Sequence, residues 1–402
     1  MNRPRRPLPR GFTLIELMVA ASMSMLVLAA AIGVGVHLQR RGLLEERIME
    51  TQNTGRAARD LIAFSVQRAG AGIGSLSLTG GQRPAGGPDV FYAVTVRTRE
   101  EFSGDPSFIP PLDGNLLSDA LEVWETDPGR MVLLTGCGSG GGGPAWADTR
   151  LCISELLRPP PAFLDNALIA VVRPGSNTSR GWACVGQVTS RVNEGVEWSP
   201  GIPGRPAPGE GNCHPNAAVA GGAWNVSETN PIYLLPLTSR GYRVNWPEGR
   251  PVLEMDVDGP SGPAAYGPVS QDIERLQVRL GVMDPGAPVN AAVRFFPDPG
   301  ANRPSLDTCT QGTCAAHVTW TWDPGVPTPP DRGPGSAGDE LMRHVRLVEL
   351  SITARSQRVE LTGEEAVGGV DDYGNPQDGF KRRHNVVRLA PRNFAFVGVG
   401  GE

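Results

Sequence analysis

The chain has 402 residues, with 37 lysines and arginines, 42 aspartates and glutamates, and a formal charge of −5 at pH 7. Recognition of nucleic acid needs a basic surface, so an acidic chain of this kind is not expected to have nucleic acid as a partner. The length is sufficient for one or two domains that bury a hydrophobic core.

The N-terminal region combines a basic leader with an apolar segment that is long enough to span a membrane. From Phe12 to Leu38, Glu16 is the only carboxylate and His37 is the only other ionisable residue, whereas about 20 apolar residues span a bilayer. The preceding positive charge predicts a cytoplasmic N-terminus and an exported remainder; it comes from Arg3, Arg5, Arg6 and Arg10. No small-residue cleavage site follows the apolar run, so we expect a retained anchor.

The membrane helix is expected to continue as an amphipathic helix. Apolar residues recur at helical spacing between charged positions, at Leu44, Ile48, Ala58, Leu61, Ile62 and Val66. Gly70, Gly72 and Gly74 then remove the side chains that support a helix. The sequence therefore predicts one long helix over residues 12–70, with residues 12–38 in the lipid and the rest against a head.

Short apolar runs between Gly- and Pro-rich loops predict a mainly β head over residues 71–402. The expected strands are 89–97, 119–126, 130–136, 167–172, 231–237, 251–257, 273–282, 291–296, 317–322, 345–354 and 385–390. The loops at 136–147, 199–212 and 323–340 contain too few apolar residues to be expected in a core. The predicted class is α+β, a long helix packed on an antiparallel head with a Cys- and Gly-rich insertion at about 136–230.

Six cysteines lie beyond the predicted anchor, and an even number in an exported chain suggests disulfides. Fifteen connectivities are possible. Pairing of nearest neighbours is the expected pattern, giving Cys137–Cys152, Cys184–Cys213 and Cys309–Cys314. Zinc is the alternative, but the last pair has no second close pair and only His317 nearby, which does not complete a tetrahedral set.

Motifs of enzymes and metal sites are weak. The stretch GCGSGG at 136–141 satisfies G-x-G-x-x-G, but no helix is expected after it, so we predict a loop. No G-x-S-x-G or H-E-x-x-H occurs, and Lys381 is not in a P-loop. A calcium site without the EF-hand register is a weak possibility, for which a solvated turn is the preferred interpretation, at Asp371, Asp372, Asn375 and Asp378. We expect no cofactor and no enzymatic activity.

The start of the apolar segment resembles the signal of type IV prepilins and pseudopilins. Gly11 is followed there by the residues FTLIEL, which end at Leu17. The resemblance implies that a prepilin peptidase cuts between Gly11 and Phe12 and methylates the new amine of Phe12. It also implies that in a filament Glu16 would lie in the apolar core and pair with the Phe12 amine of a neighbouring subunit. An acid tolerated near the lipid headgroups is the alternative for Glu16.

Later segments are similar to the minor-pilin family called PilW. They are 51–74, 118–126, 272–284, 344–356 and 383–393, whereas about 136–230 matches nothing in that family. The similarity implies a minor subunit of a type IV pilus, at or near its tip. It would prime assembly with other minor pilins and the major pilin and present a PilY-type adhesin. The head would be periplasmic before assembly and on the cell surface afterwards. A minor pseudopilin of type II secretion, and a membrane-anchored exported enzyme or sugar-binding module, are the alternatives.

Overall fold

The structure is a computed structural model with an α+β architecture, which confirms the predicted class. It describes residues 11–82, 88–102, 105–138, 141–153, 163–175, 181–192, 195–202, 213, 224–257, 265–283, 293–297, 341–342, 344–356 and 378–394. Two compact units comprise residues 1–52 and 53–402. The helix α1 contributes residues to both units.

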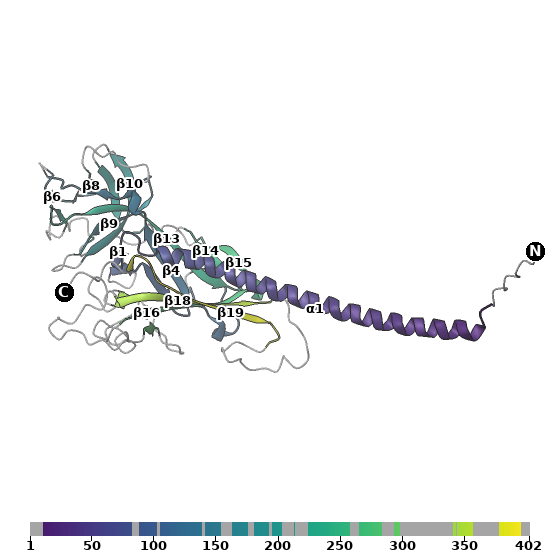
Figure 1. Ribbon diagram of the computed structural model, residues 1–402. Coiled ribbons are helices and arrows are strands. Elements are labelled where there is room, and N and C mark those ends of the chain that lie inside the picture. Colours follow the sequence, from purple (N-terminus) through teal and green to yellow (C-terminus); the bar gives the residue numbers. More distant parts are fainter. Residues whose placement is uncertain are drawn as a thin grey trace, which may run out of the picture. The chain divides into compact units, whose positions relative to one another are not determined.

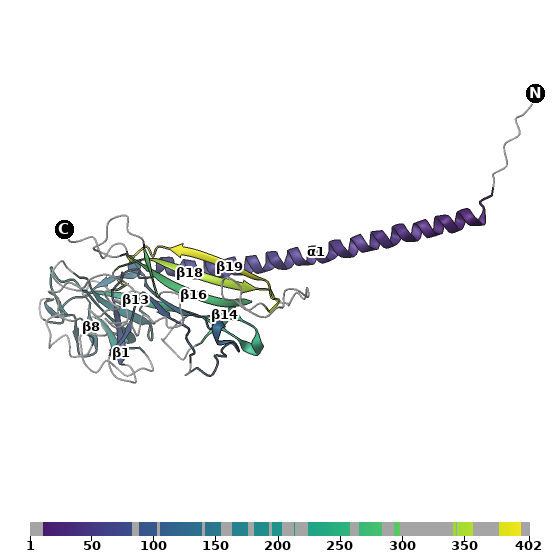
Figure 2. The same ribbon diagram turned by 90° about the horizontal axis from the view of Figure 1, so that it is seen from below.

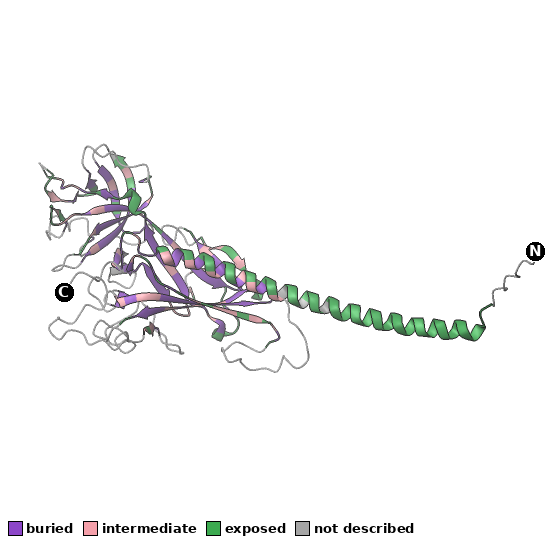
Figure 3. Ribbon diagram, in the orientation of Figure 1, coloured by how far each residue is buried: buried purple, intermediate pink, exposed green. Residues whose placement is uncertain are grey.

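The helix α1 extends over Leu14–Arg68, within two residues of the predicted bounds at each end (Figure 1). It ends where Gly70, Gly72 and Gly74 take positive φ angles of 73°, 73° and 61°, a backbone conformation that glycine adopts without penalty. In the first unit, every described side chain from residue 11 to residue 46 is exposed. Figure 3 shows this exposed part and the partly buried part that belongs to the second unit. Within the described chain, α1 is the one helix long and apolar enough to cross a membrane.

The last sixteen residues of α1 pack into the head, as the amphipathic pattern predicts. Ala58, Ile62 and Val66 are buried at a spacing of four residues, so they lie on one helix face. Leu61, which the sequence also assigns to the apolar face, is 37% exposed. That assignment is wrong because residue 61 lies one step around the helix from the buried row.

The head is built from nineteen strands in the described residues, mostly antiparallel. They are β1 (Leu78–Gln82), β2 (Pro88–Phe91), β3 (Val94–Arg97), β4 (Ala120–Thr126), β5 (Val132–Leu133), β6 (Gly143–Pro144), β7 (Trp146–Ala147), β8 (Arg150–Cys152), β9 (Leu168–Arg173), β10 (Trp182–Val192), β11 (Gly195–Pro200), β12 (Asn225–Val226), β13 (Tyr233–Asn245), β14 (Val252–Asp256), β15 (Gly267–Gln271), β16 (Ile273–Val282), β17 (Arg294–Phe296), β18 (Val345–Arg355) and β19 (Arg382–Leu389). Three short 3-10 helices are η1 (Gly114–Leu116), η2 (Pro128–Arg130) and η3 (Pro247–Gly249).

The strand β13 joins the two halves of the largest sheet. Its first residues, from Tyr233 to Pro236, pair with β9, and its later residues pair with β4 and β14. The order through this sheet is β15-β14-β13-β9-β10-β11-β8-β7. A separate sheet has the order β17-β16-β18-β19, and Figure 2 shows β16, β18 and β19 side by side.

Two hydrophobic cores lie on opposite faces of the strands β9, β10 and β13. The first core includes Ile62 and Val66 of α1 together with Ala170 of β9. The second core includes Trp146, Trp198 and Trp224, as well as Val171 of β9. Because successive side chains of a strand point to opposite faces, β9 serves both cores and is apolar from Leu168 to Val172.

The second core corrects the expectation that the 136–147 loop lies outside any core. Ala145 and Trp146 are completely buried there. The ring centroid of Trp146 lies 4.8 Å from that of Trp224 and 5.5 Å from that of Trp198. Ile202, in the predicted loop 199–212, is also buried. The glycines in this stretch predicted a loop. The free energy gained by burying the large apolar side chains among them nevertheless places the stretch in a core.

Several strand predictions need correction. The run 89–97 is interrupted after Phe91, where the Thr95 hydroxyl bonds the backbone of Tyr92, so it forms β2 and β3. The run 231–237 continues as far as Asn245. Strands β10 and β11 were not predicted. They mix polar residues with buried apolar ones such as Val188 and Trp198, and their pairing with neighbouring strands rather than their composition selects the extended backbone. The predicted strand 317–322 lies outside the described residues.

Candidate functional site

The start of α1 is closed by a reciprocal pair of residues, Thr13 and Glu16. The Thr13 backbone N–H and hydroxyl each donate to Glu16 Oε2, both at 2.9 Å. In return, the Glu16 backbone N–H donates to Thr13 Oγ1 at 3.3 Å. This is a capping box, in which an N-cap threonine and a glutamate three residues later satisfy backbone donors that a helix start leaves unpaired.

The capping box gives Glu16 a role that the sequence interpretation missed. Its signal was present, because Thr13-Leu14-Ile15-Glu16 has the S/T-x-x-E spacing. The carboxylate also lies at the positive end of the helix dipole. Both hydrogen bonds end on Oε2, so Oε1 has no partner among the described residues. The second oxygen is therefore available to a cation from outside the chain.

The residues at the predicted cleavage point lie just before the helix. Phe12 is 88% exposed, and no atom lies within 4 Å of the position that a Cβ on Gly11 would occupy. The fold of this chain therefore does not require glycine at position 11. That observation is consistent with a requirement imposed by a processing enzyme, although cleavage and methylation themselves stay predictions.

The comparison with known families identifies this segment. Residues 8–32 match the model described as the prokaryotic N-terminal methylation motif. This is a prepilin-type N-terminus. The motif supports a type IV pilin-like or pseudopilin-type exported protein, and it implies processing by a prepilin peptidase, membrane anchoring and pilin-type assembly. No curated protein and no solved structure matches the chain.

A buried polar cluster attaches α1 to the sheet of the head. The Ser65 hydroxyl and the Tyr242 hydroxyl of β13 are 2.8 Å apart. Glu125 of β4, whose side chain is 5% exposed, pairs with Arg68 at 2.9 Å and with Arg240 at 3.0 Å. Burial raises the pKa of Tyr242, so this hydroxyl stays protonated. The cluster fixes the register of the helix end on the strands, because the Ser65–Tyr242 and Arg240–Glu125 contacts are directional hydrogen bonds.

A second buried cluster surrounds Arg243 on the other face of β13. The guanidinium pairs with Asp105 at 2.5 Å and with Glu254 at 2.8 Å, and the Arg243 side chain is 1% exposed. It also lies 3.9 Å from the ring centroid of Tyr266 and 5.2 Å from that of Phe102. Burial opposes ionisation of Asp105, but hydrogen bonds from Ser107 and the charge of Arg243 outweigh it and lower the pKa of Asp105. This arrangement holds the β3–β4 connection onto the sheet.

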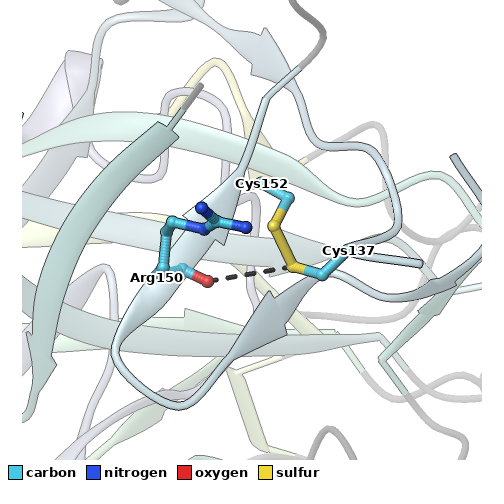
Figure 4. The surroundings of a disulfide bond; sticks show 3 residues. All are labelled: Cys137, Arg150 and Cys152. Carbon is cyan, nitrogen blue, oxygen red and sulfur yellow. Dashed lines mark hydrogen bonds between the residues drawn. A yellow bond between two sulfur atoms is a disulfide. The ribbon is translucent and has the colours of Figure 1, made fainter. Parts of the chain in front are cut away.

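Two disulfides join the nearest-neighbour pairs Cys137–Cys152 and Cys184–Cys213. Figure 4 shows the first of them, with the Cys137 sulfur 3.9 Å from the carbonyl oxygen of Arg150. Cys184 and Cys213 are themselves part of the second core. The third predicted pair, Cys309 and Cys314, lies outside the described residues.

Asp378 is the one described residue of the weak calcium candidate, and both oxygens of its carboxylate bind an arginine. Asp378 Oδ1 accepts from Arg382 Nη1 at 2.7 Å and Oδ2 accepts from Nη2 at 2.9 Å. Burial raises the pKa of Asp378, but the hydrogen bonds and charge of Arg382 lower it further than burial raises it. Asp371, Asp372 and Asn375 lie outside the described residues. Within the described ranges, no group of three His, Cys, Asp or Glu side chains is placed to hold a metal ion.

The GCGSGG stretch bonds to its own loop. The Gly136 N–H donates to the Gly141 carbonyl at 2.8 Å, and the Gly138 N–H donates to the Gly142 carbonyl at 3.0 Å. The short strand β6 follows it, as a loop interpretation predicts and a phosphate-binding motif does not.

Proposed function

We propose that this chain is a minor pilin of a type IV pilus, of the PilW kind. It is inserted as an inner-membrane prepilin with a periplasmic head and is then incorporated at or near the pilus tip. There it helps other minor pilins and the major pilin to begin assembly, and it presents a PilY-type adhesin at the cell surface. The role is structural and not enzymatic.

The observation that carries the proposal is the prepilin-type start of a single long helix. Every described side chain from residue 11 to residue 46 is exposed, and many are large and apolar, including Leu17, Met25 and Leu26. A continuous apolar surface of this length needs lipid or other apolar helices around it. A helix that leaves the lipid must therefore exchange lipid for neighbouring subunits.

Glu16 would make the transfer of the helix from lipid to neighbouring subunits depend on cleavage after Gly11. Before cleavage the Phe12 nitrogen is an uncharged amide, and cleavage after Gly11 converts it into an amine that carries a positive charge. A carboxylate in an apolar filament core needs such a partner, because an unpaired buried charge is costly. Oε1 of Glu16 is the oxygen that could accept the amine of a neighbouring subunit without opening the capping box.

The test of assembly is Glu16→Ala, with Ser24→Ala as the matched control in the same helix. Among the described residues, the Ser24 hydroxyl bonds the Ala20 carbonyl of its own helix, at 2.7 Å, so its loss should leave incorporation unchanged. Glu16→Ala should be processed and inserted normally, yet be depleted from sheared pili and fail to restore piliation in a strain that lacks the protein. Equal amounts of both variants and of wild type in the pili would refute the role of Glu16.

Processing has a separate test. Gly11→Leu should accumulate as an uncleaved precursor, whereas the wild-type protein should begin with methylated Phe12. N-terminal sequencing and mass measurement of the membrane form check both statements, and a wild-type protein that begins at Met1 would contradict them. Recovery of the wild type with a secretion apparatus, and not with sheared pili, would identify a pseudopilin instead.

A further inference from the structure

The sheet β17-β16-β18-β19 has one face against α1 and one face turned away from it. A Cβ added to Gly55 of α1 would lie 3.4 Å from the Ala354 Cβ and 2.4 Å from Asn385 Nδ2, so these residues of β18 and β19 mark the first face. Successive side chains of a strand alternate between faces. We call the second face the outer sheet face, and its central residues are Gln277, Arg279, Glu349, Ser351, Val386 and Arg388.

In the middle of the outer sheet face, two arginines share one carboxylate. The strand register places Arg279, Glu349 and Arg388 directly opposite one another, on β16, β18 and β19. Arg279 Nε donates to Glu349 Oε1 at 3.0 Å, and Arg388 Nε donates to Oε2 at 2.8 Å. The Glu349 side chain is 6% exposed, whereas that of Arg388 is 62% exposed. This charged row therefore has two guanidiniums for one carboxylate, and its surplus positive charge faces water.

The two guanidiniums are held in place before any ligand arrives. Their Cζ atoms lie 4.9 Å (Arg279) and 5.1 Å (Arg388) from the centroid of the Phe295 ring, within the range of a cation–π contact. Among the described residues, the Arg388 guanidinium bonds through Nε, and its two Nη groups have no hydrogen-bond partner. A planar fork with two unused donors matches a carboxylate, and its fixed orientation reduces the entropy lost on binding.

The next row of the same face supplies neutral groups. Gln277, Ser351 and Val386 are directly opposite one another, about 7 Å along the strands from the charged row. Gln277 and Ser351 are half-buried and Val386 is 59% exposed. The amide and the hydroxyl can bond the hydroxyl groups of a ligand, and Val386 can contact the apolar side of a ring. The two rows together therefore fit a ligand that combines a carboxylate with hydroxyl groups.

Sugar acids in a polymer have this composition, and other polyanions fit less well. Duplex nucleic acid carries one negative charge per about 1.7 Å and needs many basic contacts, whereas this chain has a formal charge of −5 and the charged row has one surplus cation. An anionic membrane is recognised by clusters of about 4 to 8 basic residues. Small molecules are usually enclosed in a concave pocket, but a strand face is open along its length. An extended acidic polysaccharide is therefore the favoured ligand.

We propose that the outer sheet face binds an acidic polysaccharide built from uronic acid units. The guanidiniums of Arg388 and Arg279 bind a carboxylate, and the row of Gln277 and Ser351 binds hydroxyl groups of the adjoining sugar. This activity goes beyond the proposed function, because the head itself would attach to a polysaccharide without an adhesin. It is measured on the isolated protein, so its failure is distinguishable from failure of the minor-pilin proposal.

The first experiment measures binding of the detergent-solubilised full-length protein to two linear polyuronates, polygalacturonate and polymannuronate, with neutral dextran as the control polymer. Arg388→Gln removes the surplus charge and leaves Glu349 paired with Arg279, so it should weaken binding roughly tenfold. Arg130→Gln is the matched control, because Arg130 is 61% exposed and its replacement changes the net charge equally. Its affinity should stay within about twofold of wild type. Equal weakening by both replacements, or no binding to either polyuronate, would overturn the proposal.

The second experiment reverses the sign of the effect. Glu349→Gln keeps both arginines and adds one more uncompensated positive charge to the row, so it should tighten polyuronate binding about threefold or more. Unchanged resistance to protease and retention of both disulfides would show that the variant is folded. Tighter binding of the wild type to duplex DNA, to phosphatidylglycerol vesicles or to polyglutamate than to the polyuronates would contradict the polysaccharide assignment. So would weaker polyuronate binding by folded Glu349→Gln.

Discussion

At the residue scale, Glu16 accepts two hydrogen bonds within its own chain, and the proposed filament adds a third contact to the same carboxylate. The bonds from Thr13 would be retained by a glutamine, because Gln can also occupy the third position of a capping box. A glutamine cannot compensate the charge of an amine. The local role and the assembly role of Glu16 are therefore separable by substitution.

We expect Glu16→Gln to keep the helix start and yet to be depleted from pili nearly as strongly as Glu16→Ala. Thr13→Ala removes the hydroxyl bonds of the capping box but leaves the carboxylate, so it should incorporate close to the wild-type level. Quantitative immunoblots of sheared pili against the membrane fraction measure this. The reverse order, with Thr13→Ala depleted and Glu16→Gln normal, would show that capping and not charge is the requirement.

Loss of the buried Arg243 side chain should destabilise the head. Arg243→Met leaves the carboxylates of Asp105 and Glu254 without their shared cation, and breaking a buried pair typically costs about 3 to 5 kcal/mol. Arg130→Met is the control, because Arg130 is 61% exposed and pairs only with Asp127 at the surface, where a pair contributes about 0 to 1 kcal/mol. Urea unfolding of the detergent-solubilised chain gives both free energies. Equal losses would refute the structural role of Arg243.

Three carboxylates of the head make its free energy of unfolding depend on pH. Hydrogen bonds and nearby arginines outweigh burial and lower the pKa values of Asp105, Glu349 and Asp378. A carboxylate whose pKa is lower in the folded state than in the unfolded state stabilises the fold. Its full contribution is present when the pH is above the unfolded-state pKa, which is about 4 for these residues. The contribution is lost as the pH falls through the folded-state pKa. The free energy of unfolding should therefore decrease below about pH 4. Replacing Glu349 with Gln should make that decrease shallower, and an unchanged pH profile would contradict the prediction.

At the scale of elements, the end of α1 is fitted closely against the strands β4 and β13. The Thr126 hydroxyl of β4 donates to the Ala71 carbonyl at 2.5 Å, and the Gly70 N–H donates to the Trp124 carbonyl at 2.9 Å. A Cβ on Gly72 would lie 2.1 Å from Thr126 Oγ1 and 2.7 Å from a Leu235 methyl carbon. Glycine is therefore needed there for its positive φ and also for its size.

Gly72→Ala should destabilise the head for two reasons, backbone strain and steric overlap, and each contributes its own cost. The left-handed backbone costs an alanine roughly 1 to 2 kcal/mol, and the overlap with the two strands adds about 1 to 3 kcal/mol. Gly249→Ala is the matched control, since Gly249 has the same φ of +73° and no atom within 4 Å of its Cβ position. Urea unfolding should therefore show a larger loss for Gly72→Ala. Equal losses would show that the overlap is relieved by movement of Thr126.

At the scale of the whole molecule, the segment between β5 and β13 forms the second core. This core packs on one face of the strands β9, β10 and β13, and the first core packs on the opposite face. Ile169 and Val171 of β9 face the tryptophan-containing core, whereas Ala170 and Val172 face the core that holds α1. The disulfide Cys184–Cys213 lies in the second core. It therefore cross-links a segment whose own side chains, among them Trp198 and Trp224, form that core.

Removing that bridge should destabilise the head more than removing the shorter one. The Cys184–Cys213 bridge closes a loop of 29 residues and the Cys137–Cys152 bridge closes one of 15. Chain entropy gives contributions of about 3.5 and about 3 kcal/mol respectively. Alanine replacement of each pair, followed by tryptophan fluorescence during urea unfolding, tests this. Unfolding midpoints that do not change after either replacement would contradict it.

The helix and the prepilin-type start could be predicted from the sequence because both depend on local order. A long apolar run, three closely spaced glycines and the residues around Gly11 define their own structure with few tertiary contacts. The runs that became β14, β16 and β18 were equally clear, because buried strands are apolar on at least one face. The capping box is also encoded locally, in the S/T-x-x-E spacing of Thr13 and Glu16.

The tertiary structure alone decided what depends on neighbours distant in the sequence. The burial of Trp146 in a Gly-rich stretch, the extension of β13 to Asn245, and the division of β9 between two cores follow from packing that no local pattern records. The same holds for Leu61 and Phe64, whose exposure depends on which face of α1 the sheets cover. Periodicity shows that a helix has two faces, but only the strands that pack against it determine which apolar residues remain outside.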